Sequence, residues 1–199
     1  AELEHIYDFW KKLRDDEKGG FFGYMNFDLN VNRNGVKGVI LNSRIMWFFS
    51  NVYLVTKKEE ALEYAKHAYD FMRKFCVDEE HGGVYWMLNA DGTIREDMKH
   101  TYNQAFAIYG LSSYYDASGD ASALELAYSI FDTIEKKCTD EYGYTEAFDR
   151  LWKPVSNEKL SEDGYMAEKT MNTLLHIIEA YTELYRVDKN PLVAERLKH

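Results

Sequence analysis

A unit of 62 residues recurs along the chain, and this recurrence constrains the fold more than any other feature. The dipeptide Asp-Glu stands at positions 16–17, 78–79 and 140–141, each time followed within a few residues by glycine and aromatic residues. Each copy predicts a tight turn that leads into a short hairpin. A repeat of this kind indicates a supersecondary unit that buries its hydrophobic face against neighbouring copies.

Two kinds of helix flank each predicted hairpin. The first kind is amphipathic, with a polar stripe typical of an outer layer, and the second kind is apolar around most of its circumference, which indicates burial. Outer helices are expected over 2–14, 58–76 and 121–137, and inner helices over 39–55, 101–117 and 168–187. An offset of 62 relates the first two copies and an offset of 70 relates the second inner helix to the third, so the third loop has gained eight residues.

Inner helices wrapped by outer ones, joined alternately by short turns and long hairpin loops, describe an α/α toroid. The predicted fold is therefore all-α, with three helix–hairpin–helix units in residues 1–199 and short β-hairpins in the long loops. The same register places His199 where His5 lies in the first outer helix. We expect an incomplete toroid that comes from a protein about twice as long; the alternative is a short natural protein that ends at this point.

Composition narrows the classes of partner. The net charge of −10 and the pI near 5.1 argue against nucleic acid and anionic membrane surfaces, and favour a neutral or cationic small molecule. The sequence has no apolar run of membrane-spanning length and does not begin with a basic and apolar leader, so a cytoplasmic location is expected.

Several common site chemistries lack a signature in the sequence. The six histidines are dispersed and no acidic loop cluster accompanies them, so no metal site is predicted. No phosphate-binding glycine loop or serine nucleophile motif is present, and no cofactor is expected. Cys76 and Cys138, 62 residues apart and without a Cys-x-x-Cys spacing, are interpreted as buried residues at helix ends.

The repeat register groups polar residues that interrupt the inner helices. Residues four apart stack on one helix face, and these positions lie near the helix N-termini, where the long loops form a plausible mouth. One level is predicted to hold Arg44, Phe106 and His176, and the level one turn earlier Ile40, Tyr102 and Asn172. The shared level favours a binding site.

Structural interpretations of the same residues stay open. Arg44 could belong to a buried ion pair, His176 could be a satisfied core histidine, and Tyr102 could be a packing aromatic. Asn172 could bond its own backbone at a helix start. His100 is assigned to the start of the helix at 101, and His81 to a hairpin turn. The loop acids that could form a glycosidase pair are Asp78, Glu79, Glu146 and Asp149; the repeated Asp-Glu residues among them are interpreted as turn caps.

Five separated blocks together resemble the N-acylglucosamine 2-epimerase family, and within it the cellobiose 2-epimerases. The blocks are GVILNSRIMWF (38–48), GGVYW (82–86), KHTYNQAFAIY (99–109), EAFDR (146–150) and KTMNTLLH (169–176). The resemblance covers essentially the whole chain. It implies a barrel of six inner helices, of which this chain holds the N-terminal half.

The resemblance also implies an activity, the inversion of C2 of a reducing-end sugar, typically the glucose unit of a β-1,4 disaccharide. In this family a histidine removes the C2 proton and a second histidine returns one to the other face of an enediolate, without a redox cofactor. Arg44 matches the arginine beside C2, and Tyr102, Asn172 and His176 match sugar-contacting positions, with Trp86 at the mouth. Neither proton-transferring histidine matches a position here, so the chain alone is expected to be inactive.

Two other functions remain open alongside the epimerase. One is an α/α-barrel glycosidase or unsaturated glycuronyl hydrolase that uses acidic residues, and the other is a non-catalytic carbohydrate-binding toroid. The expected partners are a small sugar and the missing C-terminal half of the barrel. An open half-ring exposes apolar helix flanks, so self-association of the chain is also expected.

Overall fold

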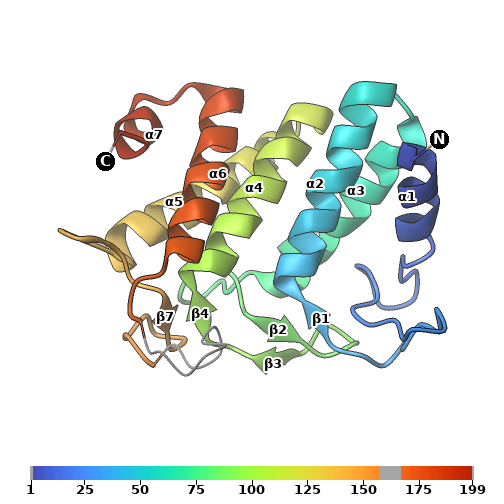
Figure 1. Ribbon diagram of the computed structural model, residues 1–199, viewed down its shortest axis with the longest axis horizontal. Coiled ribbons are helices and arrows are strands. Elements are labelled where there is room, and N and C mark those ends of the chain that lie inside the picture. The colour runs from blue at the N-terminus through green and yellow to red at the C-terminus, as the bar shows by residue number, and fades with distance from the viewer. Residues whose placement is uncertain (1, 157–166, 199) are drawn as a thin grey trace.

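The computed structural model describes residues 2–156 and 167–198 and is mostly helical. Three long helices lie side by side in one layer, α2 (Val39–Thr56), α4 (Thr101–Ser118) and α6 (Met171–Asp188) (Figure 1). The outer helices are α1 (Glu2–Lys11), α3 (Glu59–Phe71), α5 (Ala121–Lys137) and α7 (Pro191–Arg196). Each inner helix packs against the next one, and α2 and α4 also pack against α3 and α5. The chain is therefore an incomplete α/α toroid, and the predicted fold class is confirmed. His199 lies outside the described residues.

The inner helices end in a common way. Each is followed by a residue with a left-handed backbone, at which the chain turns sharply into the next outer helix. These residues are Lys57, Gly119 and Lys189, with φ angles of 58°, 72° and 56°, and their N–H groups return to the carbonyls of Tyr53, Tyr115 and Tyr185. Their spacings are 62 and 70 residues, the two offsets that the sequence predicted.

Three predicted helix boundaries were wrong. The first outer helix ends at Lys11 rather than at 14, because the chain turns there and Arg14 forms a β-bridge with Phe21. The expected helix over 58–76 is α-helical only to Phe71 and continues as a π-helix, η1 (Met72–Cys76). The third inner helix starts at Met171 rather than at 168, because the Thr170 hydroxyl accepts a hydrogen bond from the Thr173 N–H and caps it.

Short antiparallel strands gather at the end where the inner helices begin (Figure 1). The strands that lead into α2 and α4 pair with the hairpin of the following repeat, and this pairing ties consecutive repeats together. The three sheets are β1 (Lys37–Gly38) with β2 (Met87–Leu88) and β3 (Ile94–Glu96), β4 (Lys99–His100) with β7 (Ala147–Phe148), and β5 (Thr139–Asp140) with β6 (Gly143–Tyr144).

A lysine–aspartate ion pair supports each hairpin. In the first two repeats the pair is buried, with 2.7 Å between Lys37 Nζ and Asp15 Oδ2 and 3.0 Å between Lys99 Nζ and Asp78 Oδ2. The third copy, Lys169 with Asp140, is partly exposed. Each aspartate also accepts backbone N–H groups of its turn, which confirms the predicted capping role for Asp78 and Asp140. Glu79, also predicted to cap, bonds Arg73 instead.

The predicted alignment of the first turn was wrong by one residue. Asp15, not Asp16, is the equivalent of Asp78, and the side chain of Asp16 is exposed and bonds Arg14. The turn that starts at the aspartate is the same in both repeats, closed by the N–H of Gly19 or Gly82. The lysine follows the aspartate by 22 residues in the first repeat and by 21 in the second, so the first hairpin is one residue longer.

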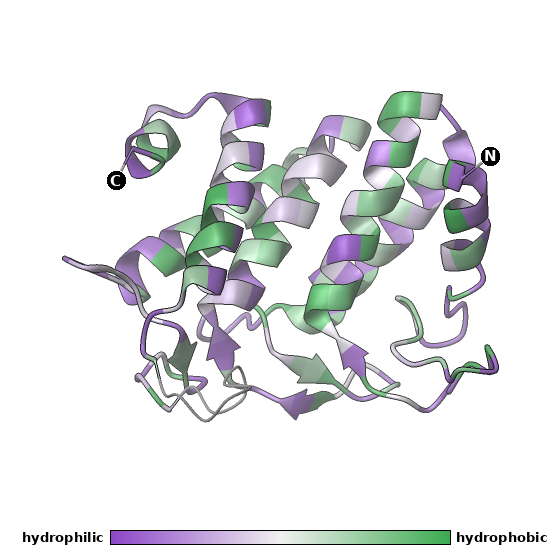
Figure 2. Cartoon of the chain, viewed as in Figure 1, coloured by the Kyte–Doolittle hydropathy of each residue, from purple (hydrophilic) through white to green (hydrophobic). Residues whose placement is uncertain are grey.

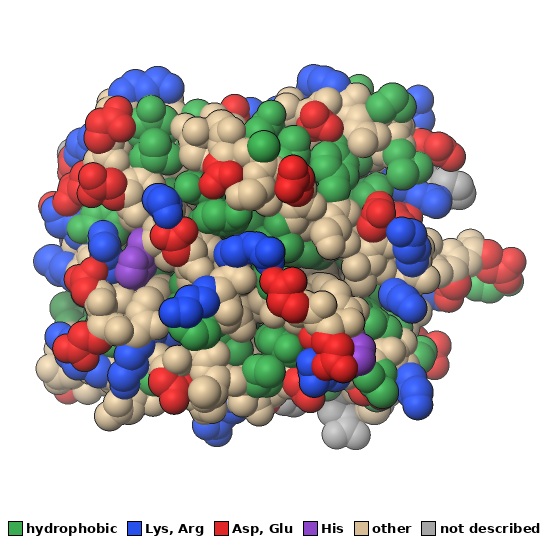
Figure 3. Space-filling view, turned by 180° about the vertical axis from the view of Figure 1, so that it is seen from behind, with side chains coloured by type: hydrophobic (Ala, Val, Ile, Leu, Met, Phe, Trp, Pro, Cys, Tyr) green, Lys and Arg blue, Asp and Glu red, His purple; other side chains and the backbone are tan. Residues whose placement is uncertain are grey.

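The core lies between the two helix layers. Cys76 and Cys138 are buried in it at helix ends, as predicted, and burial raises the pKa of the Cys138 thiol to about 12. Hydrophobic residues run through α2 and the first turns of α6 in Figure 2, while charged side chains of both signs are scattered among hydrophobic and other groups on the face seen from behind in Figure 3. Among the described residues no helix is long and apolar enough to cross a membrane.

Candidate functional site

The first turns of the inner helices bring four of the aligned side chains into one cluster. The ring of His176 on α6 lies 4.8 Å from the Tyr102 ring and 4.5 Å from the Phe106 ring, measured between centroids. The guanidinium carbon of Arg44 on α2 lies 5.5 Å from the centroid of Phe106 on α4. Arg44, Phe106 and His176 were predicted to share one level of the inner helices, and in the structure Phe106 contacts both of the others.

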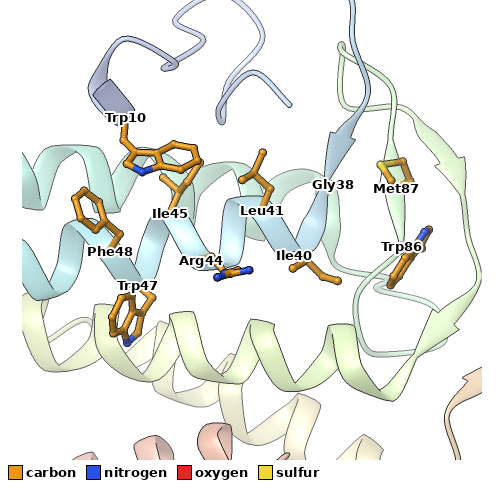
Figure 4. A pocket seen from close by; sticks show the side chains of 10 residues that line it. All are labelled: Trp10, Gly38, Ile40, Leu41, Arg44, Ile45, Trp47, Phe48, Trp86 and Met87. Atoms are coloured by element: carbon orange, nitrogen blue, oxygen red, sulfur yellow. The ribbon is translucent and has the colours of Figure 1, made fainter. Parts of the chain in front are cut away.

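A cavity of about 540 Å³ opens beside Arg44. Figure 4 shows Arg44, Ile40 and Trp47 on the side of α2 that faces α4, and Trp86 across the mouth on the neighbouring hairpin. The remaining lining is largely apolar and consists of Trp10, Gly38, Leu41, Ile45, Phe48 and Met87. A cation in a wall of aromatic rings suits a neutral polyol, whose C–H faces stack on rings while its hydroxyls bind polar groups.

Trp86 and Asn172, the other two predicted site residues, lie outside the ring cluster. Trp86 is half-buried in the cavity wall and its indole packs against the His100 ring. Asn172 lies exposed on the first turn of α6, and within the described part of the chain no hydrogen bond joins its side chain to the cluster. The structure thus brings together four of the five predicted site residues, Trp86 through the cavity that it shares with Arg44.

The Tyr102 phenol and the His176 imidazole can both form hydrogen bonds with a bound molecule. Burial raises the pKa of Tyr102, with Arg44 acting in the opposite direction, so its phenol stays protonated near neutral pH and can donate. His176 Nδ1 lies 2.8 Å from Glu179 Oε2. When Nδ1 carries the proton and donates it to this carboxylate, Nε2 is left as an acceptor.

Further along the inner helices, two more levels bring side chains of neighbouring helices together at the same offsets. The sequence analysis did not identify these contacts. The rings of Trp47 and Tyr109 stack at 5.3 Å with an interplanar angle of 14°. Below them, Asn51 donates to Ser113 Oγ at 3.4 Å, and Ser113 donates to Glu183 Oε1 at 2.7 Å. These partners stand 62 and 70 residues apart, so the repeat register was the signal that could have found them.

Comparison with known proteins places this geometry in a family. The family described as N-acylglucosamine 2-epimerase (GlcNAc 2-epimerase) matches residues 10–198. The chain belongs to the N-acylglucosamine 2-epimerase family. It is 60% identical over 195 residues to a cellobiose 2-epimerase of Ruminococcus albus, an alignment that covers 98% of this chain and 50% of that protein.

Solved structures of this epimerase family agree with the fold. A sugar epimerase from a ruminal bacterium superposes with a TM-score of 0.96 at 57% identity, over 99% of this chain and 52% of that one. The cellobiose 2-epimerase of Bacillus thermoamylovorans gives a TM-score of 0.94 at 41% identity, over 99% and 53%. The chain thus spans about half the length of these members of the family.

The loop acids of this family member do not line the cavity. Asp78 is buried and paired with Lys99 and Arg150, which hold its pKa well below the ordinary range against the effect of burial. Glu79 bonds Arg73, and Asp149 accepts backbone N–H groups of its own turn. No glycosidase-like pair forms among these acids.

His81, His100 and Glu146, the other polar residues considered in the sequence analysis, lie in or beside the hairpins. His81 lies in a hairpin turn as predicted, where its carbonyl accepts from the Trp152 indole. Glu146 and His100 are fully buried next to each other. In the described ranges, no group of three or more histidine, cysteine or acidic side chains could hold a metal ion.

Proposed function

We propose that this chain supplies half of the active site of a carbohydrate 2-epimerase, which inverts C2 of the reducing-end sugar of a β-1,4 disaccharide such as cellobiose. The observation that carries the proposal is the contact of Arg44, Phe106 and His176 beside a sugar-sized cavity. The identity of 60% to a cellobiose 2-epimerase supports it. We also propose that residues 1–199 are the N-terminal half of one (α/α)6-barrel domain.

The chemistry assigns a role to each side chain. Once the sugar ring has opened, a base removes the C2 proton, and an acid returns a proton to the opposite face. The enediolate between these steps carries negative charge on its oxygens, which needs a cation or hydrogen-bond donors close by. Arg44 is the cation of the cluster. Tyr102, His176 and Asn172 are assigned to sugar hydroxyls, and Trp86 to an apolar sugar face.

The proton-transferring groups are assigned to the missing half of the barrel. By resemblance to the family they are two histidines, and neither matches a position in this chain. We therefore expect the isolated chain to bind sugar weakly and to leave its C2 proton in place.

Deuterium exchange into C2 of cellobiose tests the proposal. The chain alone should show no exchange in D₂O, and the chain extended to the length of its relatives should show exchange together with the mannose-containing epimer. Exchange by the chain alone would overturn the half-site assignment. Release of glucose would favour a glycoside hydrolase, and sugar binding without exchange by the extended chain would favour a non-catalytic carbohydrate-binding toroid.

A further inference from the structure

A buried histidine occupies the N-cap position of α4 without capping the helix. Its equivalents in the other repeats are Gly38 and Thr170, and the Thr170 hydroxyl accepts the cap hydrogen bond from Thr173. His100 makes no side-chain cap bond, and its side chain is 0% exposed. Residues with short oxygen-bearing side chains are preferred at this position. The imidazole of His100 is therefore directed to other partners.

Those partners come from two different hairpins. The His100 ring lies 4.4 Å from the Trp86 ring between centroids, and its Nδ1 lies 3.7 Å from Glu146 Oε1. The pairing of β4 with β7 sets this geometry, since His100 is opposite Ala147 and the Thr101 N–H donates to the Glu146 carbonyl at 2.9 Å. His100 thus links Glu146 on one hairpin to Trp86 on the other.

The burial of His100 and Glu146 costs folding free energy, so stability does not explain why this pair is present. Both side chains are fully buried, and among the described residues no hydrogen bond of ordinary geometry reaches the ring nitrogens of His100 or the carboxylate oxygens of Glu146, although the Tyr102 N–H and the Thr170 hydroxyl lie close enough to the carboxylate to lower its pKa. Buried polar groups without partners cost free energy, and an apolar pair of the same shape would avoid that cost. At 3.7 Å, Nδ1 of His100 and Oε1 of Glu146 lie just beyond direct hydrogen-bond distance.

Trp86 connects the pair to the candidate site. Its indole forms part of the cavity wall that also contains Arg44, and Tyr102 of the cluster follows His100 by two residues, in the first turn of α4. We propose that His100 and Glu146 are positioning residues: Glu146 orients the imidazole, and His100 holds the Trp86 indole in the cavity wall against which the sugar packs. The sugar-binding part of this proposal rests on the proposed function.

Nuclear magnetic resonance of the chain tests the positioning itself without any sugar. The four tryptophan indole N–H signals are recorded in His100→Gln and Glu146→Gln, with Trp86→Phe to identify the signal of Trp86. We expect both variants to shift or broaden the Trp86 signal and to leave that of Trp10 unchanged. Glu183→Gln, at the far end of the inner helices, is the matched control and should move neither. An unchanged Trp86 signal in folded His100→Gln and Glu146→Gln would overturn the proposal.

Kinetics of the full-length protein test the consequence for the sugar. Each variant should raise KM for cellobiose about tenfold, which corresponds to about 1.4 kcal/mol, with kcat little changed. The double variant should be no worse than either single one, because both act through Trp86. A fall in kcat at constant KM would contradict the assignment. If the Trp86 signal shifts in the variants but the full-length protein has no epimerase activity, the positioning role of His100 and Glu146 is supported and the proposed function is rejected. Glu146→Asp is the substitute if Glu146→Gln fails to fold.

Discussion

The guanidinium of Arg44 lies over the ring of Phe106, 5.5 Å from its centroid, across the boundary between α2 and α4. The other neighbour of Phe106 is His176, on α6. Three equivalent positions of the repeat therefore carry a cation, an aromatic ring and an imidazole in direct succession. A repetitive fold carries an asymmetric set of groups here because each copy of the repeat contributes a different side chain at the same level.

Arg44→Met should separate catalysis from stability. In the full-length protein we expect kcat/KM for cellobiose to fall about 100-fold or more, because a cation beside the enediolate oxygens is lost. The free energy of unfolding should change by less than about 1 kcal/mol, since Arg44 is exposed and its aromatic contact is weak. Arg33→Met is the control, because Arg33 makes the same contact with Phe22 on the first hairpin. Equal kinetics for the two variants would contradict the assignment.

The three lysine–aspartate pairs should differ in their effect on stability. Lys37→Met leaves the buried carboxylate of Asp15 without its cation, and we expect a loss of about 3–5 kcal/mol in the free energy of unfolding. Lys169→Met removes the partly exposed copy and should cost less than about 1 kcal/mol. Urea denaturation measures both. Similar losses for the two variants would show that burial does not decide the effect.

Gly83 and Gly119 share a φ of +72° but differ in their surroundings. A Cβ on Gly83 would lie 2.6 Å from Gln104 Oε1 and 2.7 Å from the Trp152 ring, whereas nothing lies within 4 Å of a Cβ on Gly119. Gly119→Ala should cost about 1 kcal/mol from backbone strain alone. Gly83→Ala should cost about 3 kcal/mol, because crowding adds to the strain. Equal midpoints in thermal unfolding would refute the crowding.

Glu146, which is buried, and Glu183, which is partly buried, should give opposite pH dependence of stability. The pKa of Glu146 is raised by burial, so the stability it contributes is full below the unfolded pKa of about 4.5 and is lost as the pH rises through the higher folded value. Burial acts to raise the pKa of Glu183, but the hydrogen bonds from Arg186 and Ser113 and the charge of Arg186 together outweigh it, so the pKa is lowered. Its contribution is present above about pH 4.5 and is lost on acidification.

The matching variants test these signs. Relative to the parent chain, Glu146→Gln should gain stability as the pH rises above about 4.5, and Glu183→Gln should gain it as the pH falls below that value. Urea denaturation between about pH 3.5 and pH 7 measures both trends. Parallel pH curves for Glu146→Gln and the parent chain would rule out a raised pKa.

The exposed apolar stripe of α6 should cause self-association. Met171, Leu174, Leu175 and Ile178 are all exposed on this helix. We expect sedimentation velocity to show concentration-dependent oligomers of the chain, and the variant Leu175→Lys/Ile178→Lys to be monomeric. Val55→Lys, at an exposed apolar position near the end of α2, should have no effect. A monodisperse parent chain at all concentrations would contradict the prediction.

The sequence by itself determined the layers, the repeat and the level of the site. The 62- and 70-residue offsets fix which residues share a helix turn, and the apolar and amphipathic patterns fix which helices lie inside. Arg44, Phe106 and His176 could therefore be grouped without coordinates, because the periodicity of a helix converts spacing into position.

Only the tertiary structure decided which side chains meet between repeats. The one-residue shift that makes Asp15 the partner of Lys37 arises from the length of a hairpin, which the Asp-Glu pattern does not report. The contact of His100 with both Trp86 and Glu146 depends on β4 pairing with β7 from the next repeat. Such contacts are set by the packing of distant segments, and local periodicity carries no information about the direction in which a buried side chain turns.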